Sequence, residues 1–174
     1  MIYRVAQQQE ADAVWSIIED GRAALKAIGV DQWQGGLPTR AIIDEDISSG
    51  HTRVAVDDNG NILGTLVFWT QGEEDYNHPL AGQWLTGSNQ NFVALHRVAV
   101  SANAARRGVC TFMFQQAIDE ARAAGIPSVR IDTHPGNIPM QKTIAKAGFT
   151  RCIEFKLSLK EEPTKDRIGF ELVL

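Results

Sequence analysis

The chain has 174 residues, of which 44% are hydrophobic and 22% are charged, and its formal net charge is −4 at pH 7. This composition is typical of a globular protein and excludes a disordered or fibrous chain, and the length predicts one domain over residues 1–174. An extended basic face would be needed to bind nucleic acid, and the net charge argues against one.

Neither a targeting segment nor a membrane span is predicted. The first residues, MIYRVAQQQEADAVW, contain no basic region followed by an apolar stretch, and no apolar run approaches the ~20 residues that cross a bilayer. Cys110 and Cys152 lie far apart and form no CxxC pair, so we expect neither a disulfide nor a metal site. These features predict a cytoplasmic protein without membrane contact.

The first half of the chain predicts a strand, two helices and a hairpin, in that order. Residues 2–6 alternate as in a strand, and apolar residues recur at helical spacing over 10–29. Residues 39–50 predict a second helix that begins at a threonine N-cap. Two β-rich runs flank the sequence DDNG at 57–60, whose residues favour a tight turn.

The second half begins with a long polar segment, 71–91, which we interpret as a functional loop that contacts the substrate, with a partly disordered loop as the alternative. The elements expected after it are a strand, a helix, a strand, a helix and two strands, at 92–100, 109–124, 128–134, 137–148, 149–157 and 167–174. The predicted fold is a mixed α/β domain with the order β-α-α-β-β-β-α-β-α-β-β.

A basic, glycine-containing turn joins the strand at 92–100 to the following helix. A helix start has unpaired N–H groups and the positive end of the helix dipole, so Arg106, Arg107 and Gly108 predict an anion site there. The alternative is that both arginines are only solvated. Neither nucleotide-binding pattern, G-x-x-x-x-G-K-[ST] or G-x-G-x-x-G, is present, which disfavours a nucleotide fold.

Two segments resemble a known family. Residues 105–110, ARRGVC, resemble its R/Q-x-x-G-x-G/A motif, in which Gly108 matches while Ala105 and Cys110 depart from the pattern. Residues 137–149, NIPMQKTIAKAGF, resemble its N-x-x-A-x-x-x-Y-x-x-x-G-F segment. Both occur in the right order and spacing, and the order of elements also agrees. The chain therefore resembles the GNAT superfamily of acetyl-CoA-dependent N-acetyltransferases over most of its length, and in particular a group of small bacterial members.

The resemblance implies a splayed central sheet that holds acetyl-CoA. The pyrophosphate would meet the N–H groups of the 106–111 turn, and the pantetheine arm would lie along 98–100 and near Asn137. The alternatives are that 98–100 is only core strand and that Asn137 only caps a helix. The cofactor-binding residues expected are Val98, Ala99, Val100, Arg106, Arg107, Gly108, Val109, Cys110, Thr111, Asn137 and Met140.

Catalysis by the family needs a proton acceptor and commonly a tyrosine acid. Ile144 stands where many members have that tyrosine, so the usual acid is missing. The candidate bases are His96 and His134, against the alternative that each is structural. Strand periodicity would place His96 on one face with Ala94 and Val98, and for this reason it is favoured.

The predicted function is transfer of an acetyl group from acetyl-CoA to a primary amine, directly within a ternary complex. The alternative is a non-catalytic module of the same fold that binds or senses acyl-CoA. The acceptor, a small amine or a peptide, would meet the 71–90 loop with its acidic residues 73–75, the connection at 31–40 and Trp33 or Trp84. The favoured alternatives are that the acidic run is only a solvated face and that the tryptophans pack in the core or a lid. A homodimer is compatible with this reading. Cys110 lies in no His/Asp motif, so no acyl-enzyme is expected.

Overall fold

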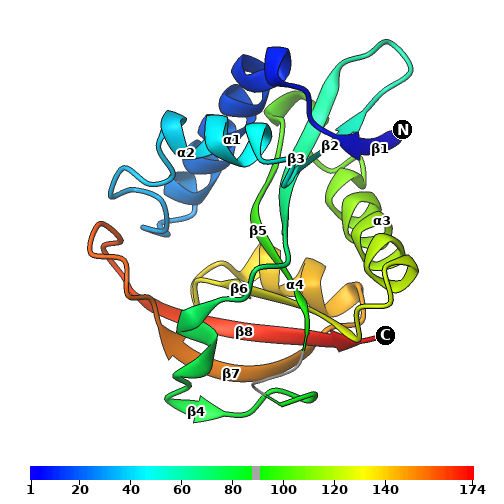
Figure 1. Cartoon of the computed structure of the whole chain (residues 1–174). Coiled ribbons are helices and arrows are strands. Elements are labelled where there is room, and N and C mark those ends of the chain that lie inside the picture. Colours follow the sequence, from blue (N-terminus) through cyan, green and yellow to red (C-terminus); the bar gives the residue numbers. More distant parts are fainter. Residues whose placement is uncertain (88–90) are drawn as a thin grey trace.

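The computed structural model describes residues 1–87 and 91–174 (Figure 1). The helices are α1 (Ala11–Ala27), α2 (Arg40–Ser48), α3 (Val109–Ala123) and α4 (Ile138–Lys146). The strands are β1 (Ile2–Val5), β2 (Thr52–Val56), β3 (Ile62–Trp69), β4 (Ala81–Gly82), β5 (Val93–Val100), β6 (Ser128–Thr133), β7 (Thr150–Lys156) and β8 (Asp166–Val173). The mixed α/β fold and the predicted order of elements are confirmed, and β4 is an addition.

The predicted 71–91 loop has structure of its own. It contains the 3₁₀ helix η2 (Glu74–Asn77) and the two-residue strand β4, which pairs with β7. Both elements are too short to leave a periodic pattern in the sequence. Residues 88–90, also within this predicted loop, lie outside the described residues.

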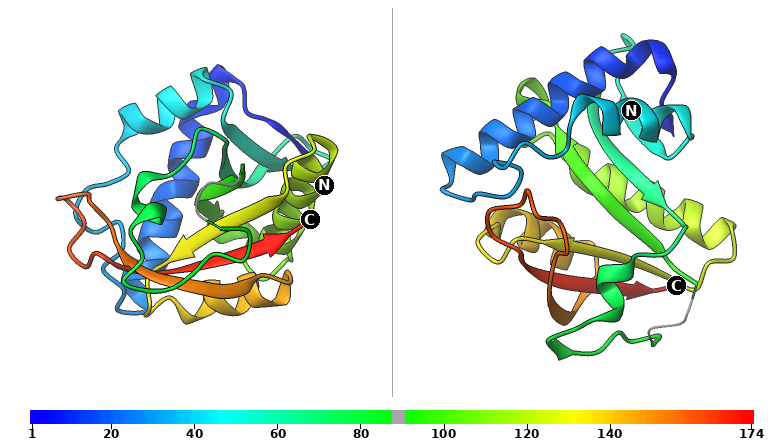
Figure 2. Two further views of the ribbon diagram at one scale, coloured as in Figure 1. Left: turned by 60° about the horizontal axis from the view of Figure 1, so that its bottom comes forward. Right: turned by 60° about the vertical axis from the view of Figure 1, so that its left-hand side comes forward.

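All described strands form one sheet with the order β1-β2-β3-β5-β6-β8-β7-β4. Helices α1 and α2 lie against one face of the N-terminal strands, while α3 lies on the other side (Figures 1 and 2). A large apolar core joins α3 and α4 to the sheet, and a smaller core lies under α1 and α2. Within residues 1–87 and 91–174, no helix combines the length and the hydrophobicity that a membrane crossing requires.

The centre of the sheet opens where β5 and β6 separate. These two strands are parallel, and their pairing is limited to Val93–Leu95 with Val129–Ile131. Beyond Leu95, β5 continues to Val100 beside β3 alone, with a register shift on the way. The backbone of this second half of β5 therefore faces a gap on its β6 side.

A buried arginine fixes the 71–87 loop to the second half of the sheet. Arg130 of β6 is fully buried, and its Nε donates to Glu171 Oε1 of β8 at 3.0 Å. Its Nη2 donates to Gly87 O at 2.6 Å, and its guanidinium lies 4.3 Å and 4.1 Å from the ring centroids of Trp84 and Phe92. Trp84 is thus a core residue that packs on this cation, rather than part of an acceptor pocket.

Replacing Arg130 by methionine should lower the free energy of unfolding by about 3–5 kcal/mol, because it leaves the buried Glu171 carboxylate without its cation. Urea denaturation measures this loss. The matched control is Arg151→Met, which breaks an exposed pair with Glu154 and should cost less than about 1 kcal/mol. Equal effects of the two substitutions would contradict this account of Arg130.

Candidate active site

A single large cavity occupies the gap between β5 and β6. Its volume is about 1280 Å³, and its lining comes from α1, α2, α3, α4, the central strands and the connections that follow β3 and β7. A pocket for one drug-sized ligand is typically ~300–1,000 Å³. The cavity therefore has room for two ligands side by side.

One end of the cavity is the start of α3. Gly108 is the N-cap residue, with φ 78°, and Arg106 before it also has a positive φ, 63°. The first intrahelical bond runs from Phe112 N to Gly108 O at 2.9 Å, which leaves the N–H groups of Val109 to Thr111 directed away from the helix. This turn can receive an anion.

The structure brings most of the predicted cofactor-binding residues to this cavity. Those that line it are Val98, Ala99, Val100, Arg106, Gly108, Val109, Cys110, Thr111, Asn137 and Met140. Arg107 does not: its side chain lines a separate surface hollow with Glu10 and Asp57. Asn137 lines the cavity and also caps α4, since its Oδ1 accepts from Met140 N at 3.2 Å.

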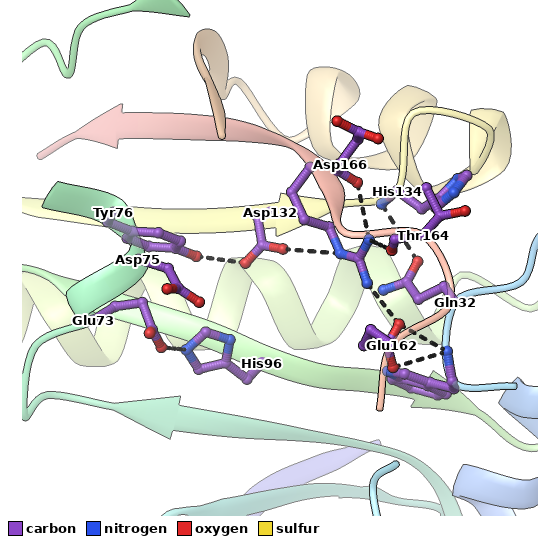
Figure 3. Close-up of polar contacts among 12 residues, drawn as sticks. Gln32, Glu73, Asp75, Tyr76, His96, Asp132, His134, Glu162, Thr164 and Asp166 are labelled. Atoms are coloured by element: carbon purple, nitrogen blue, oxygen red, sulfur yellow. Dashed lines mark hydrogen bonds and ion pairs between the residues drawn. The ribbon is translucent and has the colours of Figure 1, made fainter. Parts of the chain in front are cut away.

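At the other end of the cavity, His96 faces the carboxylate of Glu73, the N-cap residue of η2. His96 Nε2 lies 3.1 Å from Glu73 Oε2, and both side chains are largely shielded from solvent (Figure 3). Burial raises the pKa of Glu73, but the hydrogen bond from His96 and its charge outweigh this, so the pKa lies below its usual value. Glu73 is therefore a fixed anion beside the ring.

The expectation that His96 and Val98 share one face is wrong, because β5 has a bulge. His96 and Ala99 are three residues apart on β5, but the residues of β3 that pair with them are only two apart. Arg97 and Val98 therefore lie together opposite one residue of β3. Arg97 takes a φ of 50° at this point. As a result Val98 packs into the α3 core, whereas His96 faces Tyr76.

His134 lies outside the cavity lining. Its Nδ1 accepts from Gly136 N at 2.9 Å and its Nε2 lies 3.4 Å from Asp31 Oδ1. Burial and then the charge of Arg167 lower the pKa of His134. With one ring nitrogen used by its own turn and the other beside Asp31, His134 has a structural role in this arrangement.

A chain of polar contacts beside His96 has no counterpart in the sequence expectations (Figure 3). The hydroxyl of buried Tyr76 donates to Asp132 Oδ1 at 2.8 Å, and Arg167 Nε lies 3.8 Å from Asp132 Oδ2. Arg167 Nη2 in turn donates to Glu162 Oε2 at 2.8 Å. Asp132 lies in β6, and its tyrosine partner is 56 positions away in the sequence.

Comparison with known proteins decides the family. The model of the Acetyltransferase (GNAT) family matches residues 13–149, which is most of the chain. The chain belongs to the GNAT family. Its family membership makes it an acyltransferase, and no curated protein sequence matches it.

Solved structures agree with this assignment. A GNAT-family acetyltransferase from Streptococcus agalactiae is 29% identical, with a TM-score of 0.86, and the match covers 99% of this chain and 95% of that one. A second, from Listeria monocytogenes, is 18% identical with a TM-score of 0.73 and coverages of 99% and 94%. A ribosomal-protein-alanine N-acetyltransferase from Brucella melitensis is 16% identical with a TM-score of 0.69 and covers both chains fully, at 100%. The last two show the fold alone.

The GNAT chain departs from its family pattern in two places that the structure explains. Ile144 is fully buried in the α3–α4 core and contributes nothing to the cavity. Cys110 does line the cavity, but burial raises the pKa of its thiol to about 12. A thiol with this pKa is almost entirely protonated at neutral pH and is a poor nucleophile.

Cys110 should therefore resist alkylation in the folded protein. At pH 8 the raised pKa reduces the thiolate fraction about 10³-fold relative to an ordinary cysteine, and iodoacetamide labelling should slow accordingly. Peptide mass spectrometry at timed intervals measures the labelling, with the urea-denatured protein as the control. Labelling of Cys110 at equal rates in the two states would contradict this environment.

Proposed function

We propose that this protein transfers an acetyl group from acetyl-CoA to a primary amine within a ternary complex. The observation that carries the proposal is the position of the His96–Glu73 pair in the same cavity whose opposite end is the anion-accepting start of α3. A cavity of about 1280 Å³ provides the space for donor and acceptor together. Residues 1–174 would act as one domain, since strands from both ends of the chain form the sheet.

The residues at the start of α3 fit acetyl-CoA, which supplies a thioester-activated acetyl group when bound. Gly108 and the N–H groups that follow it can receive a pyrophosphate, and Arg106 adds positive charge on the cavity side. The second half of β5, which lacks β6 as a neighbour, presents backbone groups to an extended amide chain in the way that a strand receives an added strand.

Glu73 determines where His96 holds its proton. When the neutral ring donates its Nε2 proton to the Glu73 carboxylate, the free lone pair lies on Nδ1. That nitrogen can accept the proton that a primary ammonium, with a pKa of about 10, loses before it becomes nucleophilic. The imidazolium that forms stays beside an anion, as in other carboxylate–histidine pairs.

The chain offers no acid from position 144, where Ile144 lies in the core. None is required at neutral pH, because a coenzyme A thiol has a pKa near that of cysteine, about 8.5. The alternative function, an acyl-CoA-binding module without turnover, would need only the end of the cavity at the start of α3. Acetyl-CoA consumption in the presence of primary amines separates the two functions.

Replacing Gly108 by alanine should weaken CoA binding. A side chain at a φ of 78° strains the turn, and the strain falls where the backbone would approach the pyrophosphate. Titration calorimetry should show affinity at least about tenfold lower. Gly125→Ala is the matched control, because Gly125 has a φ of 68° at the far end of the α3 region and does not line the cavity. Equal CoA affinity in the two variants would argue against this binding site.

Replacing His96 by alanine should lower kcat by on the order of 10²-fold or more while CoA affinity changes little, because the proton acceptor is lost but the α3 end is intact. The wild-type profile of kcat/KM should fall at acidic pH, and this limb should be absent from the variant. His78→Ala, which removes an exposed histidine, and His134→Ala are the controls. An unchanged profile in His96→Ala would exclude His96 as the base.

A further inference from the structure

We infer that the acceptor is a small primary amine with an apolar body and no carboxylate, rather than the terminal amine of a polypeptide. This inference rests on the proposed function and concerns its acceptor end. It follows from how the β7–β8 connection, residues 157–165, crosses that end of the cavity, and from the side chains that line it. We call this connection the strap.

A buried carboxylate joins the strap both to β8 and to the α1–α2 connection. Glu162 and Arg167 have side chains that are only 3% and 2% exposed, and they form the 2.8 Å contact already described. The Glu162 carboxylate also accepts from Trp33 N, at 3.2 Å. Trp33 takes a φ of 67°, an uncommon conformation for a large residue, and this contact fixes it there. The strap and the α1–α2 connection are therefore joined through a buried carboxylate.

Two further contacts extend this junction. Thr164 Oγ1 donates to Asp31 Oδ2 at 2.6 Å. Gly35 approaches the strap so closely that a Cβ on it would lie 1.6 Å from Glu161 O. The two connections meet along several residues, and Figure 2 shows them crossing at one side of the molecule. A polypeptide that approached from this side would have to separate them.

The other end of the strap is attached to the loop that carries Glu73. Asp75 Oδ2 accepts from Ser158 N at 3.0 Å. The strap thus connects the η2 segment, which packs on β7, to the α1–α2 connection. His96 lies within this frame, beside Glu73. The acceptor must reach the ring through an opening that three joined segments limit.

The lining at this end combines apolar walls with excess negative charge. The apolar side chains are Trp33, Leu37, Ile42, Trp69, Leu157 and Leu159. The carboxylates are Glu45, Asp46, Glu73, Asp75, Asp132, Glu161 and Glu162, and the guanidinium groups are Arg97 and Arg167. Both guanidinium groups already contact carboxylates, Arg97 at 2.7 Å from Asp46. An ammonium is favoured here, an apolar body is accommodated, and a carboxylate on the acceptor meets like charge.

The test uses four acceptors that share one amine and one apolar body: phenethylamine, phenylalaninamide, phenylalanine and a tetrapeptide that begins with phenylalanine. Acetyl transfer is followed by thiol release and mass spectrometry. We expect phenethylamine to be acetylated with a kcat/KM about tenfold or more above phenylalanine, because of the carboxylate, and about 10²-fold or more above the tetrapeptide. Transfer to the tetrapeptide or to phenylalanine at the rate of phenethylamine would overturn the inference and leave the proposed function intact.

The remaining outcomes are also decisive. CoA binding by calorimetry without transfer to phenethylamine would overturn the inference, whereas the absence of both CoA binding and transfer to any amine would overturn the proposed function itself.

Two variants then test the strap: Glu162→Ala removes the carboxylate, and Gly35→Val forces the connections apart. Each should raise kcat/KM for the tetrapeptide relative to kcat/KM for phenethylamine at least about fivefold. Lys160→Ala, at an exposed position of the same strap, should leave this ratio of the two kcat/KM values unchanged. Thermal melting identifies a variant that fails to fold, in which case the wild-type panel decides.

Discussion

The limited pairing of β5 with β6 is the constraint on which the rest of the molecule depends. Two parallel strands that shared their full length would form a continuous hydrophobic layer with nothing between them. Here the ladder stops at Leu95, and the remaining half of β5 extends alone beside β3. The centre of the sheet therefore has a strand edge whose backbone N–H and C=O groups lack a neighbouring strand. Such an edge is stable only where another group can hydrogen-bond to it. The candidate active-site cavity lies in that opening.

The bulge in β5 divides the opening between two kinds of chemistry. On regular alternation His96 and Val98 would face the same side, and the ring would lie over the α3 core. Because the strand gains a residue at Arg97, His96 turns toward Glu73 and Tyr76 while the side chain of Val98 stays in the core. The proposed base and the backbone that would receive the donor therefore lie on one strand but face different parts of the cavity.

The sequence was sufficient for the longer elements and for the turn that precedes α3, because both depend on local patterns. Helical periodicity, the turn at 57–60 and the glycine before α3 act over a few residues. The acceptor end could not be predicted in this way. Tyr76 meets Asp132 and Trp33 meets Glu162 only after the sheet has formed, since each pair joins segments from different halves of the chain. The bulge also has no local signal, because Arg97 is neither glycine nor asparagine.

Three carboxylates lie around His96, the proton acceptor of the proposed mechanism. The charge of His96 acts favourably on Glu73, Asp46 and Asp132, although burial raises the pKa of the last two. Arg97 and Arg167 each stand beside one of these carboxylates, so the field around His96 is held by ion pairs that line the cavity rather than by mobile surface charges. Such a field does not need to reorganise when the proton moves, and this is the condition under which fixed charges contribute most to catalysis.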